Sequence, residues 1–253
     1  MKTVAICNHK GGSGKTTSAY YLGNLLAEMG LGTLLIDLDA QANLTGRFVD
    51  EIGEEISPTV ADALGGAVDP KVTLREVLVP VRADAPLFLA PSELQLANTA
   101  VGLLNDAVRG RTALRRAMAS VKGQFDVCVI DCPPEAGIML VNALLTADRI
   151  LCPAEPEPDA LTGVKRIVEI ADHVRREFER ETPTVMGTIA SSVDLRTNRH
   201  RDGLEVMKRS MLAPLRAIIP QVNGEQRDER LRFAYAPLAV RLQKWVGGDD
   251  DNA

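Results

Sequence analysis

A glycine-rich segment near the start of the chain carries the residue types that bind phosphate. It runs from His9 to Thr17, reads HKGGSGKTT, and follows a short apolar run. Glycines let successive backbone N–H groups point at phosphate oxygens, and the helix expected next adds the positive potential of its N-terminus. Lys15 would reach the β- and γ-phosphates, and Thr16 offers a hydroxyl ligand to Mg²⁺. His9 stands where the strict GxxxxGK[ST] pattern has its first glycine, yet the segment still predicts a nucleotide-binding loop.

Carboxylates follow two other apolar runs. Asp37 and Asp39 come at the end of Thr-Leu-Leu-Ile-Asp, and Asp131 ends the run that begins at Val127. The carboxyl ends of strands in an open parallel sheet face the ligand crevice, so these side chains are expected near the γ-phosphate and its metal. Asp131 would hold a water on Mg²⁺. The pattern favours phosphoryl transfer, which depends on positioning and charge neutralisation. Two exposed turn aspartates are the alternative interpretation of Asp37 and Asp39.

Strand-like and helix-like segments that would position these groups alternate along the whole chain. This predicts an α/β fold, doubly wound, with a mostly parallel sheet and helices on both faces. Residues 46–85 are expected to form short helices and loops. The expected strands are 3–8, 33–37, 87–90, 127–131, 150–153, 184–190 and 218–220; the expected helices are 15–29, 94–104, 111–121, 139–147, 161–178, 203–211 and 238–246.

Composition limits the class of protein. The chain has 253 residues, of which 45% are hydrophobic and 25% charged, and this excludes a disordered, collagen-like or coiled-coil chain. Its four cysteines stand singly in apolar runs, so we interpret them as reduced core residues of a cytosolic protein rather than metal ligands. No apolar run is long enough for a membrane span or a signal peptide.

Charge is unevenly distributed along the chain. The net charge is −5, but residues 161–246 hold 16 Lys and Arg against 11 Asp and Glu, a local balance of +5. The rest of the chain therefore carries −10. The C-terminal part would present either a basic face to a polyanion or a solvated helix face of mixed charge.

A second lysine at the start of the glycine loop suggests a family. Lys10 has no role in an ordinary phosphate-binding loop, and the loop resembles the deviant Walker A motif of the ParA/Soj/MinD family. The match continues through residues 37–45 (DxDxQxNxT), residues 125–134 (FDxxxIDxPP), the segment around Glu157 and residues 218–220 (IIPxN). Prolines at 156 and 158 and the sequence of residues 223–227 depart from the family pattern, which affects the expected base and interface contacts.

The resemblance implies roles for individual residues. Lys10 would cross a dimer interface to the partner's phosphates, and Asp39 would orient the attacking water. The implied catalytic residues are Lys10, Lys15 and Asp39; the nucleotide site comprises Lys10, Gly11, Gly12, Ser13, Gly14, Lys15, Thr16, Thr17 and Pro220; the metal site comprises Thr16, Asp39 and Asp131; and DNA would meet Arg196 and Arg227, with Arg199 and Arg201 as basic neighbours.

The implied protein is a DNA-partitioning ATPase that uses ATP and Mg²⁺. It would dimerise with ATP, bind DNA non-specifically, and hydrolyse ATP slowly until a ParB-like or cargo adaptor partner stimulates it, in the cytoplasm on the nucleoid. We expect residues 1–248 to form a single P-loop ATPase domain and 249–253 a disordered acidic tail. The start at the first strand favours the small type that has no operator-binding extension.

Three alternatives remain open at this point. A relative that spreads large cargo over the nucleoid would use the same physics as a partitioning ATPase. A membrane regulator of the MinD type needs a basic amphipathic helix at the end of the chain, whereas residues 249–251 are all aspartate. A metabolic P-loop ligase of the dethiobiotin synthetase type would use Lys10 on a small substrate.

Replacing Lys15 with alanine is expected to abolish nucleotide binding, because its ammonium group would meet the β- and γ-phosphates. Titration with a fluorescent ATP analogue measures the effect. An unchanged affinity for ATP would end the interpretation of residues 9–17 as a phosphate-binding loop.

Overall fold

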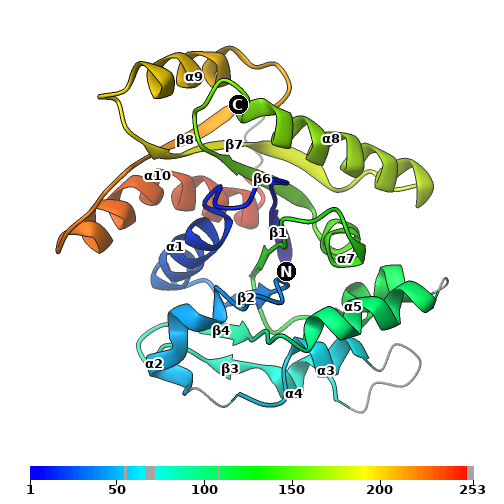
Figure 1. Cartoon of the computed structure of the whole chain (residues 1–253). Coiled ribbons are helices and arrows are strands. Elements are labelled where there is room, and N and C mark those ends of the chain that lie inside the picture. Colours follow the sequence, from blue (N-terminus) through cyan, green and yellow to red (C-terminus); the bar gives the residue numbers. More distant parts are fainter. Residues whose placement is uncertain (54–55, 66–71, 107–108, 250–253) are drawn as a thin grey trace.

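One sheet organises the molecule. The computed structural model describes residues 1–53, 56–65, 72–106 and 109–249, so most of the predicted tail lies outside the described residues (Figure 1). Within them, eight strands pair in the order β3-β4-β2-β5-β1-β6-β7-β8. The strands are β1 (Lys2–Ile6), β2 (Thr33–Asp37), β3 (Val79–Pro80), β4 (Leu87–Ala90), β5 (Val127–Asp131), β6 (Arg149–Ala154), β7 (Thr184–Val193) and β8 (Leu215–Pro220).

All strand pairs are parallel except β3 with β4, where the short β3 closes one edge antiparallel to its neighbour. The predicted α/β fold with a mostly parallel sheet is therefore confirmed. Every residue of β2 and β5 is buried, as expected where helices cover both faces of a parallel sheet.

Alternation along the strands divides the core between two layers. In and just after β1, Ala5 and Cys7 face one layer, while Val4 and Ile6 face the other. Helices α1 and α10 pack on the Val4 side, and α7 and α8 cover the opposite face (Figure 1). The described helices are α1 (Lys15–Glu28), α2 (Val49–Ile52), α3 (Val60–Gly65), α4 (Leu74–Val77), α5 (Leu96–Asn105), α6 (Ala113–Ala117), α7 (Ile138–Thr146), α8 (Ala160–Glu177), α9 (Asn198–Arg209) and α10 (Arg227–Gly247).

Three of the expected helices differ from the structure by more than two residues. Helix α10 begins at Arg227 rather than at residue 238, and it continues through Pro237. Proline lacks the N–H that would donate a helical hydrogen bond. The buried side chains of Leu231 and Tyr235 before it and of Leu238 after it offset the cost of that missing bond. Helix α9 begins at residue 198, where Thr197 caps it by accepting the N–H of residue 200. The expected helix 111–121 is instead divided into a short α-helix, α6, between two 3₁₀ turns.

The last residues before the end of the described chain close α10. Gly248 has a left-handed conformation (φ 92°), and Asp249 donates its backbone N–H to the carbonyl oxygen of Lys244. No helix in the described part of the chain combines the length and apolarity that crossing a membrane requires.

Helix α9 rests directly on the backbone of the segment between β6 and α8. A Cβ atom added at Gly203 would lie 2.0 Å from the carbonyl oxygen of Pro156. Because the contact is with backbone, a neighbouring side chain cannot relieve it by changing rotamer. The absence of a side chain at this position therefore fixes how closely α9 approaches the residues around Glu157.

Two glycine substitutions test this close approach. Gly203→Ala is expected to lower the free energy of unfolding by about 1–3 kcal/mol through overpacking. Gly102 lies inside α5, and a Cβ atom added there would have nothing within 4 Å, so Gly102→Ala should instead raise the stability by roughly 0.5–1 kcal/mol. Urea unfolding measures both, and equal effects would contradict the packing described for Gly203.

Candidate functional site

The predicted chemical groups meet at the carboxyl edge of the sheet. Asp131 pairs in register with Ile6, the last residue of β1 before the glycine loop, and on its other side with Asp37. Pro220 ends β8 at the same edge, in register with Val193. Parallel strands bring these groups together although they lie far apart in the sequence, as predicted for an open α/β sheet.

The glycine loop is fixed against β7. Gly12 and Gly14 have positive φ angles of 72° and 91°, which favour glycine. A Cβ atom at Gly14 would also lie 3.1 Å from the Cβ of Ser191, whose hydroxyl donates to the backbone oxygen of Ser13 at 2.7 Å. The loop therefore has a defined shape, and Ser191 is a supporting residue that sequence reasoning did not assign to it.

Lys15 lies inside this loop. Its side chain belongs to the first residue of α1, is 7% exposed, and donates from Nζ to the backbone oxygen of Lys10 at 3.2 Å. The next two residues lie on the first turn of α1, where Thr17 Oγ1 accepts from Arg47 at 3.2 Å. A buried ammonium group at the N-terminus of a helix, beside a glycine-rich loop, favours an anion.

Asp37 organises the loop that carries Asp39. The fully buried Asp37 carboxylate accepts from the backbone N–H and the hydroxyl of Thr45, both at 2.9 Å, and from the N–H of Asp39 at 3.1 Å. Burial nevertheless raises the pKa of Asp37 to about 6. Ser92 Oγ donates to the carbonyl oxygen of Asp39 at 2.8 Å. The Asp39 side chain remains half-buried and accepts the N–H of Gln41 at 3.0 Å.

Asp131 is a buried acid without a partner. It is 1% exposed, and within the described residues neither carboxylate oxygen has a hydrogen-bond partner of ordinary geometry; the buried hydroxyl of Ser13 also lacks one. Burial raises the pKa of Asp131 well above its usual value, and the negative charge of Asp37 adds to the effect, whereas the Thr16 hydroxyl and the Lys15 charge act in the opposite direction. A cation bound at this edge of the sheet would therefore stabilise the ionised form of Asp131.

Lys10 points away from its own loop. Its Nζ lies 2.6 Å from Oε2 of Glu157, and its side chain is 48% exposed. Glu157 also contacts Arg199 at 3.2 Å. The sequence identified Glu157 as a motif position but did not indicate these two contacts, because they join three segments distant in the chain.

The predicted DNA-binding arginines fall into two groups. Arg196 makes a bidentate ion pair with Asp194, at 2.8 and 2.7 Å, which lowers the pKa of Asp194 to about 2; Arg199 contacts Glu157. Arg201 bonds to the Asn198 side chain, and Arg227 lies exposed at the first turn of α10. Neither of these two has an ion pair with a carboxylate in the part of the chain that the structure describes.

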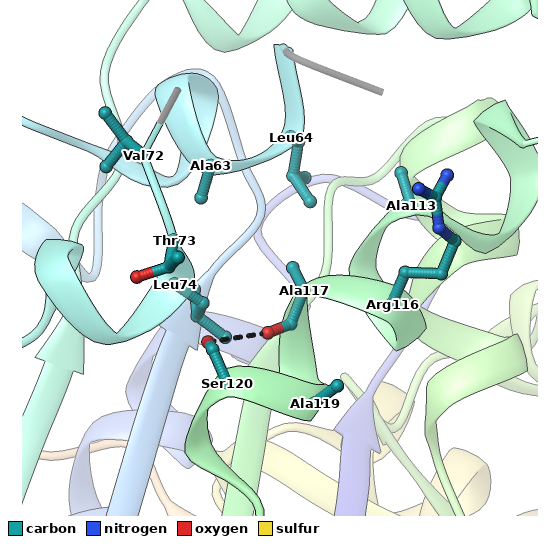
Figure 2. A pocket seen from close by; sticks show the side chains of 10 residues that line it. All are labelled: Ala63, Leu64, Val72, Thr73, Leu74, Ala113, Arg116, Ala117, Ala119 and Ser120. Carbon is teal, nitrogen blue, oxygen red and sulfur yellow. Dashed lines mark hydrogen bonds between the residues drawn. The ribbon is translucent and has the colours of Figure 1, made fainter. Parts of the chain in front are cut away.

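One hollow adjoins the glycine loop, and another lies beside the loop that carries Asp39. The first, of about 460 Å³, lies between Asn8, Lys10 and the start of α8, and the second, of about 370 Å³, lies beside Asp39 and Pro133. Figure 2 shows a third, of about 270 Å³, where Ser120 donates to the Ala117 carbonyl among small apolar side chains from α3, α6 and their neighbours. No residue predicted to act on nucleotide or DNA lines this third hollow.

Comparisons with known proteins agree with this geometry. The family profile described as "AAA domain" (AAA_31) matches residues 1–183. The sporulation initiation inhibitor protein Soj of Bacillus subtilis is 31% identical over 82% of this chain and 79% of its own. An uncharacterised protein of Mycobacterium tuberculosis is 35% identical over 82% of this chain, which spans 62% of the length of that relative.

A solved structure extends the likeness to the whole chain. Cobyrinic acid a,c-diamide synthase from Mycobacterium smegmatis, with bound ATP analogue and magnesium, has a TM-score of 0.83 and 32% identity, covering 98% of this chain and 97% of that one. The glycine loop, the acids beside it and these sequence relatives together confirm the resemblance drawn from the motifs. The chain belongs to the ParA/Soj family of P-loop ATPases.

Proposed function

We propose that this chain is a ParA-type ATPase that dimerises with ATP, binds DNA without sequence preference as the dimer, and segregates or positions a cargo with a ParB-like or adaptor partner. The observation that carries the proposal is that the two lysines of the glycine loop lie in different environments. Lys15 is buried inside the loop, whereas the Lys10 ammonium lies outside it on an exposed side chain. A cation placed there is accessible to a second subunit but does not neutralise phosphate in its own loop.

Mg²⁺ fits the donor set at the carboxyl edge. The unpartnered carboxylate of Asp131, the Thr16 hydroxyl and the half-buried Asp39 are oxygen donors, which this ion prefers. The buried charge of Asp131 is costly without a compensating cation. Bound with ATP, the ion would supply charge neutralisation at the β- and γ-phosphates.

The protein's own groups would do the remaining work in hydrolysis. The loop N–H groups and Lys15 hold the phosphates, and Asp39 orients a water toward the terminal one. Asp37 acts through the loop by fixing the N–H groups of Asp39 and Thr45. Lys10 of the second subunit would add positive charge at the transferred phosphoryl group. Because the catalytic site is incomplete without that subunit, a single subunit would hydrolyse ATP slowly; stimulation by a ParB-like or adaptor partner is proposed from the family.

Arg227 is the strongest candidate among the proposed DNA contacts. It is exposed and has no carboxylate partner among the described residues, whereas Arg196 is neutralised by Asp194. Phosphate contacts of this kind release counterions, so binding should weaken steeply with salt. Such a dimer would act in the cytoplasm, on the nucleoid. The metabolic alternative is supported by the similarity to the diamide synthase, and it predicts no DNA binding in any nucleotide state.

A DNA mobility shift with ATP, ADP and no nucleotide tests the proposal. Of the three nucleotide states, only the one with ATP should give a protein–DNA complex. This complex should not depend on DNA sequence, and it should weaken as the salt concentration increases. Arg227→Glu should weaken that complex while ATP binding is retained. Lys122→Glu, a charge reversal just before β5 at the opposite edge of the sheet, is the matched control and should bind normally. Absence of an ATP-dependent complex would favour the metabolic alternative.

Asp131→Asn is expected to stabilise the protein in EDTA without nucleotide, by more than about 1 kcal/mol, because it removes a buried charge whose oxygens have no hydrogen-bond partner of ordinary geometry among the described residues. An Asp with a raised folded-state pKa loses stability as pH rises from its unfolded value through the folded one. The gain from the substitution should therefore be larger at pH 8 than at pH 5. Thermal unfolding measures it, with the exposed Asp202→Asn as control; a gain independent of pH would contradict the assigned burial cost.

A further inference from the structure

Lys10 is held at its backbone by Asn8, which is anchored to β6, and at its side chain by Glu157 in the segment that joins β6 to α8. Its N–H donates to Asn8 Oδ1 at 3.1 Å, and Asn8 in turn donates to the carbonyl oxygen of Pro153 at 2.5 Å. The Lys10 ammonium contacts Glu157 at 2.6 Å. A Cβ atom at Gly163 would lie 2.2 Å from Asn8 Oδ1, so α8 approaches Asn8 closely enough to confine it. The position of Lys10 in the single subunit is therefore defined rather than free.

Glu157 is well placed to hold the Lys10 side chain. Its side chain is 15% exposed, and the close contact between Gly203 and Pro156 supports its backbone from the side of α9. The hydrogen bond between the two side chains lowers the pKa of Glu157 and raises the pKa of Lys10. The negative charges of Asp159 and Glu155 raise the pKa of Lys10 further. The ammonium thus lies in a locally acidic environment outside the phosphate-binding loop.

We propose that Glu157 is a positioning residue that holds Lys10 in the single subunit, and that Lys10 must leave Glu157 before it can reach the phosphates of a second subunit. This rests on the proposed function for its second half, since only an ATP-bound dimer gives Lys10 another anion to contact. The first half concerns the single, nucleotide-free subunit and is independent of it.

Removing Arg199 should affect Lys10 in the opposite direction to removing Glu157. Arg199 contacts Oε1 of the same carboxylate whose Oε2 holds Lys10. Two cations that share one carboxylate compete for it, so removing Arg199 leaves Glu157 to attract Lys10 alone. Loss of Glu157 should therefore release Lys10, and loss of Arg199 should hold it more firmly. A role of Glu157 in stability alone would not give effects of opposite sign.

The first experiment uses the nucleotide-free protein. An amine-acylating reagent is applied at fixed pH, and mass spectrometry follows the rate of modification of Lys10. Glu157→Gln should accelerate this rate about two- to five-fold, the range for losing one exposed ion pair, and Arg199→Ala should slow it. Glu205→Gln removes a comparable ion pair with Lys208, at 2.8 Å on α9, and should leave Lys10 unchanged. An unchanged rate in Glu157→Gln would overturn the proposal.

The second experiment measures dimerisation with a non-hydrolysable ATP analogue by analytical ultracentrifugation. Each dimer releases two lysines, so Glu157→Gln should lower the dimer dissociation constant by about 4- to 25-fold, and Arg199→Ala should raise it. Weaker dimerisation in Glu157→Gln would overturn the second half of the proposal. If the unmodified protein stays monomeric with the analogue, the proposed function fails and the second half with it, while the acylation experiment still decides the first half.

Discussion

The candidate site depends on two adjacent buried carboxylates at the carboxyl edge of the sheet. Parallel pairing places Asp131 directly beside Asp37, and both carboxylates are almost completely shielded from water. Burial raises the pKa of both carboxyl groups, and the negative charge of Asp37 adds to the effect at Asp131, whose oxygens have no hydrogen-bond partner of ordinary geometry within the described residues. In the proposed function, a cation bound at this edge would offset the local cost in fold stability.

Much of the fold and the phosphate-binding loop could be predicted from sequence, because both depend on local patterns. The glycines of the loop, the apolar strands and the acids at their ends are short-range signals, and the order of elements then limits the topology. The predicted start of α10 was wrong because Pro237 is normally a helix terminator, and only tertiary burial on both sides shows why it is tolerated.

The contacts of the site were harder to predict for a different reason. Glu157 reaches Lys10 across 147 positions of sequence, and Ser191 reaches the glycine loop across 178. Pairings of this range depend on which strands become neighbours, and nothing in the flanking residues encodes them. The arginines show a different limit: the motif resemblance placed Arg196 and Arg227 in one group, but only the structure shows that Asp194, two residues away in the sequence, pairs with the first.

The hydrogen bonds around Asp39 have a consequence for turnover. The Asp37 carboxylate and the hydroxyl groups of Thr45 and Ser92 hold that loop by hydrogen bonds within the protein. Part of the conformational entropy of ordering the loop is therefore lost on folding. In the proposed ATPase this loop would need little reordering after each turnover, so the separation and reassociation of the two subunits would set the pace of repeated cycles.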